Sequence, residues 1–511
     1  MALIDIQLPK SLAKALRLPQ KSPRRQQLKV LRKLLKKARF TEFGQKYRFD
    51  EILLDRRHRG KKFQQLVPTS DYNTIYEAWW HQTLEGKADV CWPGKIKYYA
   101  LSSGTSEAGS KYIPITNDLL RGNRIVMVRQ LLTLRNYKDI PVKSIGKGWL
   151  MIGGSTSLQK GAGYYSGDLS GITARKVPFW FQPFYKPGKK VAKTQDWTKK
   201  LEEVVRLAPQ WDIGFLVGVP GWIQLCMEKV IEKYNLNNIH EIWPNLGFFV
   251  HGGVSFDPYR KGFEKLLGKP ITYIETYLAS EGFIAYQDLQ NTKGMRLVTN
   301  QHIFLEFVPF DSKNFDADGN LVSNPEAYMI HEVEEGKDYA LLLSTSAGAW
   351  RYLIGDTVRF LDKERCEIII TGRTKHFLSL VGEHLSVDNM NKAVQLATEE
   401  MNLSIPEFTV AGVPHGLFFA HQWWLACNDP VDEALLRQKI DDRLKELNDD
   451  YAVERNSALK DVYVKVLPEQ KFMDFMRLKG KIGGQHKFPR VLKGKMLLDW
   501  QKFLETGSLN S

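Results

Sequence analysis

The stretch YYALSSGTSEAGSK at residues 98–111 decides the fold that we expect. A β-favouring run leads into a loop of small and hydroxyl-bearing residues that ends at a lysine. Small residues let backbone N–H groups approach phosphate oxygens, hydroxyls add hydrogen-bond donors, and a lysine neutralises charge. The stretch therefore predicts a strand followed by a phosphate-binding loop, with a purely structural Ser/Gly turn as the alternative. The predicted phosphate-binding residues are Ser102, Ser103, Gly104, Thr105, Ser106 and Lys111.

This loop differs from the P-loop of nucleoside triphosphatases, G-x-x-x-x-G-K-[ST]. Gly104 and Gly109 have the correct four-residue gap, but Ser110 follows the second glycine where the lysine belongs. Tyr112 stands where the magnesium-binding hydroxyl belongs. The sequence therefore argues against a kinase or ATPase of that fold.

Outward from this loop, strand-like runs at 148–152, 212–217, 246–250 and 271–275 alternate with amphipathic helical stretches. That alternation predicts an α/β fold whose sheets are covered by helices. From about residue 294, turn clusters predict a β-rich portion. The pattern resets after TGRTK at 371–375, where an α+β pattern followed by a basic, glycine-containing tail begins. We predict a large N-terminal domain at 1–372, a smaller mobile C-terminal domain at 376–511, and a hinge near 371–378.

Composition limits the class of protein. The chain has 511 residues, 43% of them hydrophobic and 25% charged, which excludes a disordered chain or a small disulfide scaffold. Four scattered cysteines predict a reducing compartment. The sequence has no run of 18 apolar residues and no secretory-type apolar stretch near Met1, so we expect a cytoplasmic protein without a membrane span.

The formal net charge of +16 lies almost entirely in an N-terminal arm, residues 1–62. This arm has 19 Lys or Arg residues against 5 Asp or Glu residues, which leaves +2 for the rest of the chain. Leu28, Leu31, Leu34 and Leu35 recur in it at roughly helical spacing. We expect a helix that packs a leucine face on the body. Attraction to RNA or anionic lipid is the alternative, although the aromatic residues of a single-strand platform are missing there.

Four more segments combine with the loop. VHGGVS at 250–255 offers two glycines against which a flat base could lie, and a tight turn explains it almost as well. YIETYLASEG at 273–282 contains Glu281, a candidate Mg²⁺ ligand or a solvated acid at a strand end. WRYLIGDTV at 350–358 contains Asp356, which could accept hydrogen bonds from both ribose hydroxyls or simply form a hairpin turn. GGQHKFPR at 483–490 sets cations on a glycine loop, unless it is a solvated tail.

The order of these five segments resembles the Gretchen Hagen auxin-responsive family of acyl-acid amido synthetases, in the adenylate-forming superfamily. The resemblance runs from residues 38–44 and 67–72 to the tail at 485–490. This chain differs by having Ala108 where the family usually has glycine, and His486 where the family has an aromatic residue.

The resemblance implies ATP and Mg²⁺ as cofactors, and a small carboxylic acid and an amino acid as substrates. It implies a ligase that adenylates the acid and passes the acyl group to the amine. It also implies nucleotide binding by the loop residues above, Mg²⁺ binding by Glu281, and catalytic roles for Lys375 and Lys487. The further nucleotide-binding residues that it implies are Gly252, Gly253, Tyr277, Ser280, Asp356 and Arg373.

Lys487 is the candidate cation for the α-phosphate, delivered by the small domain, with Lys375, Lys493 and Lys495 as alternatives. We expect residues 219–222 to contribute to the acyl pocket. Two other functions stay open. One is an acyl-CoA ligase that uses the same first step, and the other is a non-catalytic nucleotide- or RNA-binding protein. Nucleic acid is the less expected partner.

Overall fold

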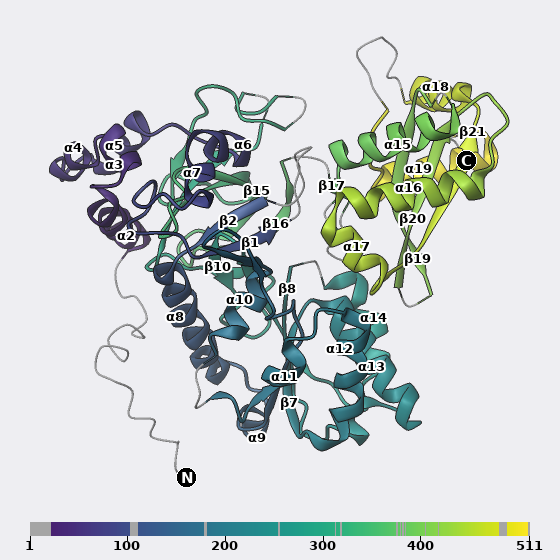
Figure 1. Cartoon of the computed structure of the whole chain (residues 1–511), viewed down its shortest axis with the longest axis horizontal. Helices are drawn as coiled ribbons and strands as arrows, with labels where there is room; N and C mark the ends of the chain where they lie inside the picture. The colour runs from purple at the N-terminus through teal and green to yellow at the C-terminus, as the bar shows by residue number, and fades with distance from the viewer. Residues whose placement is uncertain are drawn as a thin grey trace.

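The structure is a computed structural model, and it describes residues 22–102, 111–177, 181–253, 256–311, 313–316, 319–374, 377–378, 380, 383, 385–403, 405–416, 418–479 and 488–508. The chain folds into a large N-terminal domain and a smaller C-terminal domain, at the left and right of Figure 1. Helices cover the strands in both domains, so the predicted α/β class is confirmed. The boundary at 372–376 and the hinge near 371–378 stay predictions.

The first described helix, α2 (Pro23–Ala38), confirms the expected helix in the basic arm. Leu31, Leu34 and Leu35 are buried on one face, because residues three and four apart lie on the same side of a helix. A proline at the first helical position suits the start of the helix, where the missing N–H has no partner to lose. The short helices that follow are α3 (Glu42–Lys46), α4 (Phe49–Leu54), α5 (Arg59–Leu66), α6 (Tyr72–Ile75) and α7 (His81–Leu84).

A twelve-stranded sheet forms the centre of the large domain, with the order β13-β12-β14-β15-β16-β11-β10-β9-β8-β7-β3-β6. The run β9-β8-β7-β3-β6 is parallel, and the remaining neighbours pair antiparallel. The parallel strands are β3 (Gly148–Met151), β6 (Tyr185–Lys186), β7 (Ile213–Gly218), β8 (Phe248–Gly252) and β9 (Thr272–Ala279). The other strands are β10 (Gly282–Tyr286), β11 (Met295–Leu297), β12 (Ile303–Pro309), β13 (Tyr328–Met329), β14 (Asp338–Thr345), β15 (Tyr352–Asp362) and β16 (Glu367–Arg373).

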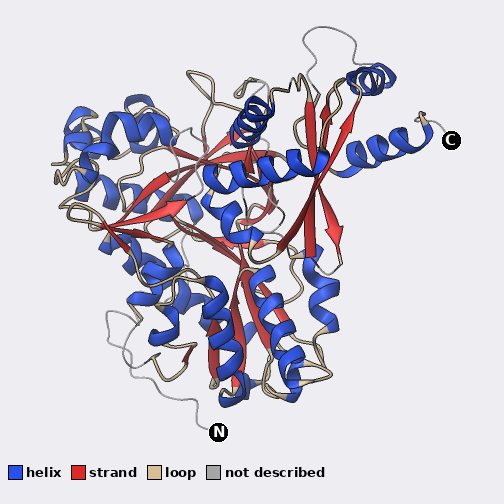
Figure 2. Ribbon diagram, turned by 45° about the vertical axis from the view of Figure 1, so that its right-hand side comes forward, coloured by secondary structure: helices blue, strands red, loops and turns tan. Residues whose placement is uncertain are grey.

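Helices cover the parallel half of this sheet because parallel strands need crossover connections (Figure 2). α13 follows β7 and α14 follows β8. The helices of this domain after α7 are α8 (Asn117–Thr133), α9 (Val142–Ile145), α10 (Leu169–Arg175), α11 (Lys189–Ala192), α12 (Trp197–Leu207), α13 (Pro220–Tyr234) and α14 (Asp257–Lys265).

A second sheet of the large domain has the order β2-β1-β5-β4. Its strands are β1 (Tyr98–Ser102), β2 (Lys111–Ile115), β4 (Gln159–Lys160) and β5 (Tyr165–Gly167). β1 and β2 pair antiparallel, and Ser102 lies opposite Lys111 at the end of the ladder. The predicted strand at the start of the phosphate loop is therefore confirmed, and the loop connects these two residues.

The C-terminal domain contains a three-stranded sheet, β19-β20-β21, and a two-stranded one, β17-β18. The expected basic tail is wrong in part, because a helix begins at Gly494 and buries Trp500. The strands are β17 (Phe377–Leu378), β18 (Leu385–Ser386), β19 (Phe408–His415), β20 (Phe418–Ala426) and β21 (Leu459–Leu467). The helices are α15 (Val387–Met401), α16 (Glu433–Leu447), α17 (Asp449–Arg455), α18 (Glu469–Leu478) and α19 (Gly494–Thr506).

The two domains are in contact through α14 and α13 of the large domain. The Tyr259 hydroxyl donates to the backbone oxygen of Leu380 at 2.8 Å, and the Tyr259 ring packs on Phe419 with 5.4 Å between centroids. The Trp222 indole N–H donates to Glu454 of α17 at 2.9 Å. Among the described residues, no helix is long and apolar enough to span a membrane.

Candidate functional site

Two of the predicted segments meet where strands far apart in the sheet come together. β15 carries Asp356 and β9 carries Tyr277, and three strands lie between them in the sheet order. Since neighbouring strands are about 4.8 Å apart, a flat sheet would separate them by about 19 Å. The Tyr277 hydroxyl nevertheless donates to Asp356 Oδ2 at 2.5 Å. The antiparallel half of the sheet therefore curls on itself and brings the two segments to one place.

Asp356 receives a second donor from the neighbouring strand. Arg373 on β16 lies directly opposite Asp356 in the ladder, and its Nε donates to Asp356 Oδ1 at 2.6 Å. Burial, and then the charge of Asp356, raise the pKa of the Tyr277 hydroxyl well above its usual range. Tyr277 therefore keeps its proton and remains a donor. These contacts bring together three of the predicted nucleotide-binding residues.

A bulge in β15 orients the Asp356 side chain. Ala340 on β14 pairs with Thr357 on β15, and the next pair joins Leu342 to Leu353. Between these pairs, β15 therefore contains more residues than β14. The extra residues include Gly355, whose φ of +92° is one that other residues rarely adopt. Bulges of this kind redirect side chains beside functional sites. The Gly-Asp pair is therefore a bulge that orients Asp356, where the sequence alone had left a simple hairpin turn open.

Glu281 lies in the turn between β9 and β10 and is only 8% exposed. Burial raises the pKa of its carboxyl group above the usual value, and the nearby Asp356 charge adds to this. The charge of Lys111 and a hydrogen bond from the Tyr352 hydroxyl act in the opposite direction. Asp356 and Lys111 therefore lie close enough to Glu281 for their charges to change its pKa. Ser280 lies beside them in the same turn and is partly buried.

Lys111 enters the site from the second sheet. Its Nζ lies 5.4 Å from the centre of the Tyr72 ring, and the Tyr72 oxygen accepts the backbone N–H of Tyr112 at 2.9 Å. Ser102, its partner in the ladder, lies at the other end of the predicted phosphate loop. Lys111, at one end of that loop, therefore lies close enough to the Glu281 carboxylate for their charges to interact.

Two different local constraints require glycine at residues 252 and 253, at the end of β8. Gly252 pairs with Thr276 on β9, and a Cβ atom there would come within 2.3 Å of the Thr276 oxygen. Gly252 is thus required by close strand packing, whatever lies above it. Gly253 has a φ of +86°, a left-handed conformation that favours glycine. Gly252 pairs with Thr276, which immediately precedes Tyr277 on β9. Both glycines therefore lie at the edge of the site next to Tyr277.

The predicted acyl-pocket stretch at 219–222 lies where the two domains meet, because Trp222 donates to Glu454 there. Its role in the acyl pocket stays a prediction. The predicted residues outside the described ranges are Ser103, Gly104, Thr105, Ser106, Lys375 and Lys487.

Sequence reasoning missed the role of Tyr352. This residue opens β15 and donates to Glu281, and it is 2% exposed. Its backbone is held by Arg351, which has an unusual φ of +43° and a buried ion pair to Glu306 at 3.1 Å. The bulge at Gly355 lies between Tyr352 and Asp356, so their spacing in the sequence does not show that they share a face of the strand.

The carboxylates of the site could hold a metal ion only with help from a ligand. Among the described residues, no group of three or more His, Cys, Asp or Glu side chains is arranged to hold a metal. Mg²⁺ typically takes one or two carboxylates together with substrate phosphates. Glu281 and Asp356, next to a lysine and a predicted phosphate loop, provide such a donor set. The residues present therefore fit a magnesium ion that arrives with a nucleotide.

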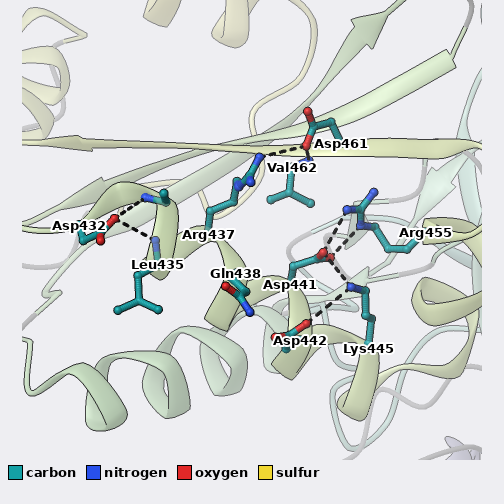
Figure 3. Close-up of a pocket in the computed structure, with 11 residues that line it drawn as sticks. Asp432, Leu435, Arg437, Gln438, Asp441, Asp442, Lys445, Arg455, Asp461 and Val462 are labelled. Atoms are coloured by element: carbon teal, nitrogen blue, oxygen red, sulfur yellow. Dashed lines mark hydrogen bonds and ion pairs between the residues drawn. The ribbon is translucent and has the colours of Figure 1, made fainter.

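A separate cavity of about 510 Å³ lies on the C-terminal domain, between α16 and β21 (Figure 3). Its charged residues pair with one another. Asp441 accepts from Arg455 at 2.8 Å and from Lys445 at 2.9 Å, and Arg437 lies 3.5 Å from Asp461. None of the residues predicted from the sequence lines it. Its charges are compensated internally, so the candidate site is the one around Glu281 and Asp356.

Comparison with family sequences identifies three regions of the chain. Residues 13–208 match the GH3 family N-terminal domain, residues 296–366 the GH3 family central domain, and residues 388–495 the GH3 family C-terminal domain. A curated relative from Oryza sativa subsp. japonica, a probable indole-3-acetic acid-amido synthetase, is 30% identical over 154 residues. That alignment covers 29% of this chain and 30% of the relative. The chain thus aligns with about a third of the length of the curated relatives that it matches.

Solved structures extend the fold comparison to nearly the whole chain. A GH3.15 acyl acid amido synthetase superposes with a TM-score of 0.58 and 17% identity, over 96% of this chain and 95% of the other. A 2-hydroxyisobutyryl-CoA ligase, solved with 2-HIB-AMP and CoA, superposes with a TM-score of 0.60 and 13% identity, over 99% and 98% of the two chains. At such identities, these comparisons establish the fold.

Proposed function

The chain belongs to the GH3 family, and from that premise we propose that it is an ATP-dependent acyl-acid amido synthetase. It adenylates a small carboxylic acid and transfers the acyl group to the amine of an amino acid. The observation that carries the proposal is the convergence of Tyr277, Glu281, Asp356 and Arg373 at one place, with Lys111 facing them. The rice relative, named as a probable indole-3-acetic acid-amido synthetase, supports the same class of reaction.

In the first step, a carboxylate oxygen attacks the α-phosphorus of ATP, a new P–O bond forms, and pyrophosphate leaves. The reaction brings an anion against a triphosphate, so positioned cations give the largest stabilisation. We assign the phosphates to Lys111 and the loop that it closes, and Mg²⁺ to Glu281. Bound Mg²⁺ neutralises charge on the phosphate oxygens. Lys487 is our candidate for the α-phosphate and Lys375 for the hinge.

We assign the nucleoside to Asp356, Tyr277 and the glycines of β8. Each carboxylate oxygen of Asp356 accepts one donor in the structure, from Tyr277 or Arg373. A carboxylate oxygen has two lone pairs, so both oxygens can also accept a ribose hydroxyl. The Tyr277 and Arg373 contacts hold the carboxylate in a fixed orientation before the nucleotide arrives.

In the second step, the neutral amine attacks the acyl carbon, a C–N bond forms, AMP leaves with the electron pair of the C–O bond, and the nitrogen loses a proton to solvent. The C-terminal domain contributes to this step if it rotates at the proposed hinge. The four cysteines are free and buried, as a reducing compartment requires, and we place the reaction in the cytoplasm.

The main alternative function differs in the molecule that accepts the acyl group, which would be CoA in place of an amino acid. An acyl-CoA ligase would share the adenylation step, and the fold superposes equally well on the 2-hydroxyisobutyryl-CoA ligase. The test is a panel of carboxylic acids screened by pyrophosphate release, followed by amino acids and CoA screened by product mass. Amide products that appear only with an amino acid support the proposal. Thioester products with CoA, or nucleotide binding without any turnover, would overturn it.

A further inference from the structure

One face of α2 carries an uninterrupted set of cations. The apolar face of this helix is buried on the body, while its other face is exposed. α2 contains no acidic residue, so nothing within the helix balances this charge. We call the following exposed side chains the basic face: Arg24, Arg25, Lys29, Arg32, Lys33 and Lys36 of α2, with Arg56 and Arg57 before α5.

The cations of the basic face repel one another. Burial and then the charges of Arg32 and Arg56 lower the pKa of Arg59, so guanidinium groups from α2 and from the start of α5 lie close together. Burial and then the charge of Lys29 likewise lower the pKa of Lys33. Such a surface is stabilised by any anion that comes near it.

The described residues balance this charge only in part, with Asp55 acting on Arg59. Within the described ranges, the ion pairs of this region lie at its edges, such as Lys37 with Asp118 at 2.6 Å and Lys61 with Glu332 at 3.1 Å. No ion pair among the described residues involves Lys29, Arg32, Lys33 or Lys36. Residues 1–21 add four Lys or Arg residues and one Asp, and residues 63–511 add only +2.

Two large apolar side chains are exposed beside these cations. Phe40, just after α2, is 67% exposed and lies under the Arg39 guanidinium at 4.3 Å from its ring centre. Leu54, at the end of α4, is 82% exposed, and α4 packs against α2. Basic residues flanked by exposed Phe and Leu are typical of surfaces that lie on anionic bilayers, where the apolar side chains enter the headgroup region.

We propose that the basic face, with Phe40 and Leu54, docks this protein on an anionic lipid bilayer. A bilayer suits these residues better than RNA, because single-strand RNA sites stack bases on several aromatic side chains, and Phe40 is the exposed aromatic residue at this face. The location is also suitable. Helices α2 to α5 lie at the end of the molecule opposite the C-terminal domain (Figure 1), so docking leaves both domains free to act.

The test is flotation of the full chain with phosphatidylcholine vesicles, with and without 30% phosphatidylglycerol, over a range of salt concentrations. The wild type is expected to float only with the anionic vesicles, and less so as salt rises. A triple variant, Lys29→Glu, Lys33→Glu and Lys36→Glu, should lose more than about 100-fold in partition coefficient, because each lost basic residue weakens binding by about fivefold and each new carboxylate adds repulsion.

The matched control makes the same charge change elsewhere on the large domain, with Lys199→Glu, Lys229→Glu and Lys233→Glu on α12 and α13, whose side chains are exposed. It is expected to float like the wild type. Phe40→Ser with Leu54→Ser should weaken binding about tenfold without changing its salt dependence.

Three results would overturn the proposal. The first is no flotation of the wild type with anionic vesicles. The second is equal loss in the basic-face and control variants, which would indicate a net-charge effect. The third is binding of an RNA oligomer, with the same variant pattern, in place of vesicles. Normal circular dichroism and unchanged AMP formation in the triple variant show that it is folded, since the basic face lies away from the catalytic site.

Discussion

Replacing Tyr352 by phenylalanine tests how the carboxylate of Glu281 is tuned. The substitution removes one hydroxyl, which donates to Glu281 in a place where both side chains are less than 9% exposed. A buried hydrogen bond to a charged group contributes about 1.5–3 kcal/mol. Its loss should raise the pKa of Glu281 further above its usual value, because this hydrogen bond is one of the interactions that lower it.

The sign of the effect follows from the role of Glu281. Mg²⁺ binds the ionised carboxylate, so acid-dependent ATP–pyrophosphate exchange falls as pH drops through the pKa of this group. In Tyr352→Phe, the acidic limb of the pH profile should therefore move to higher pH, and exchange on that limb should fall by about tenfold or more, with the plateau rate less affected.

The assay is exchange measured from pH 5 to 9 at saturating Mg²⁺. Tyr137→Phe is the matched control, because Tyr137 is also buried and its hydroxyl donates to the Gln287 backbone oxygen at 2.9 Å, in the same domain. A folded Tyr352→Phe variant whose acidic limb coincides with those of the wild type and Tyr137→Phe would refute the reasoning.

Three further predictions concern Asp356, Glu454 and Lys487. Asp356→Ala removes the hydrogen-bond acceptor shared by Tyr277 and Arg373. It should lower kcat/KM for ATP about 100-fold, roughly 3 kcal/mol, in pyrophosphate exchange. A change within threefold would contradict the assignment of Asp356 to the ribose. Burial raises the pKa of Glu454 to about 8, so the folded state binds a proton that the unfolded state releases, and stability should fall as pH rises from about 4.5 to 8. Glu454→Gln, which does not titrate, should therefore gain in Tm relative to the wild type across this window, and a constant Tm difference would oppose the assignment. Lys487→Ala should lower exchange about 10²- to 10³-fold, and an unchanged rate would move the role to Lys375, Lys493 or Lys495.

Local pattern was sufficient for most elements of the fold. The apolar runs predicted strands at 148–152, 212–217, 246–250 and 271–275, where the structure has β3, β7, β8 and β9. The site segments were also visible, since Glu281 and Asp356 lie in turn-rich stretches whose residue types suit a nucleotide. The helix α19 was missed because a glycine-rich, basic stretch precedes it and hides the period of Trp500 and Phe503.

The long-range geometry could not be read from local pattern. The curl that brings β15 to β9 depends on the pairing of five strands, and no short window of sequence encodes it. The Tyr352–Glu281 bond depends on that curl, because the two residues are 71 positions apart in the chain. The contact of Trp222 with Glu454 likewise depends on how the domains meet, and no local pattern at residues 219–222 indicates it.

In the proposed reaction, one nucleotide is held at Glu281 and Asp356 and activates an acid through its α-phosphorus. The most direct measurement uses a turned-over carboxylic acid labelled with ¹⁸O in both carboxyl oxygens, incubated with MgATP and the amino acid acceptor. The mass of the AMP released should increase by one ¹⁸O atom, because the attacking oxygen stays on phosphorus when the amide forms. Unlabelled AMP alongside the amide product would contradict the account.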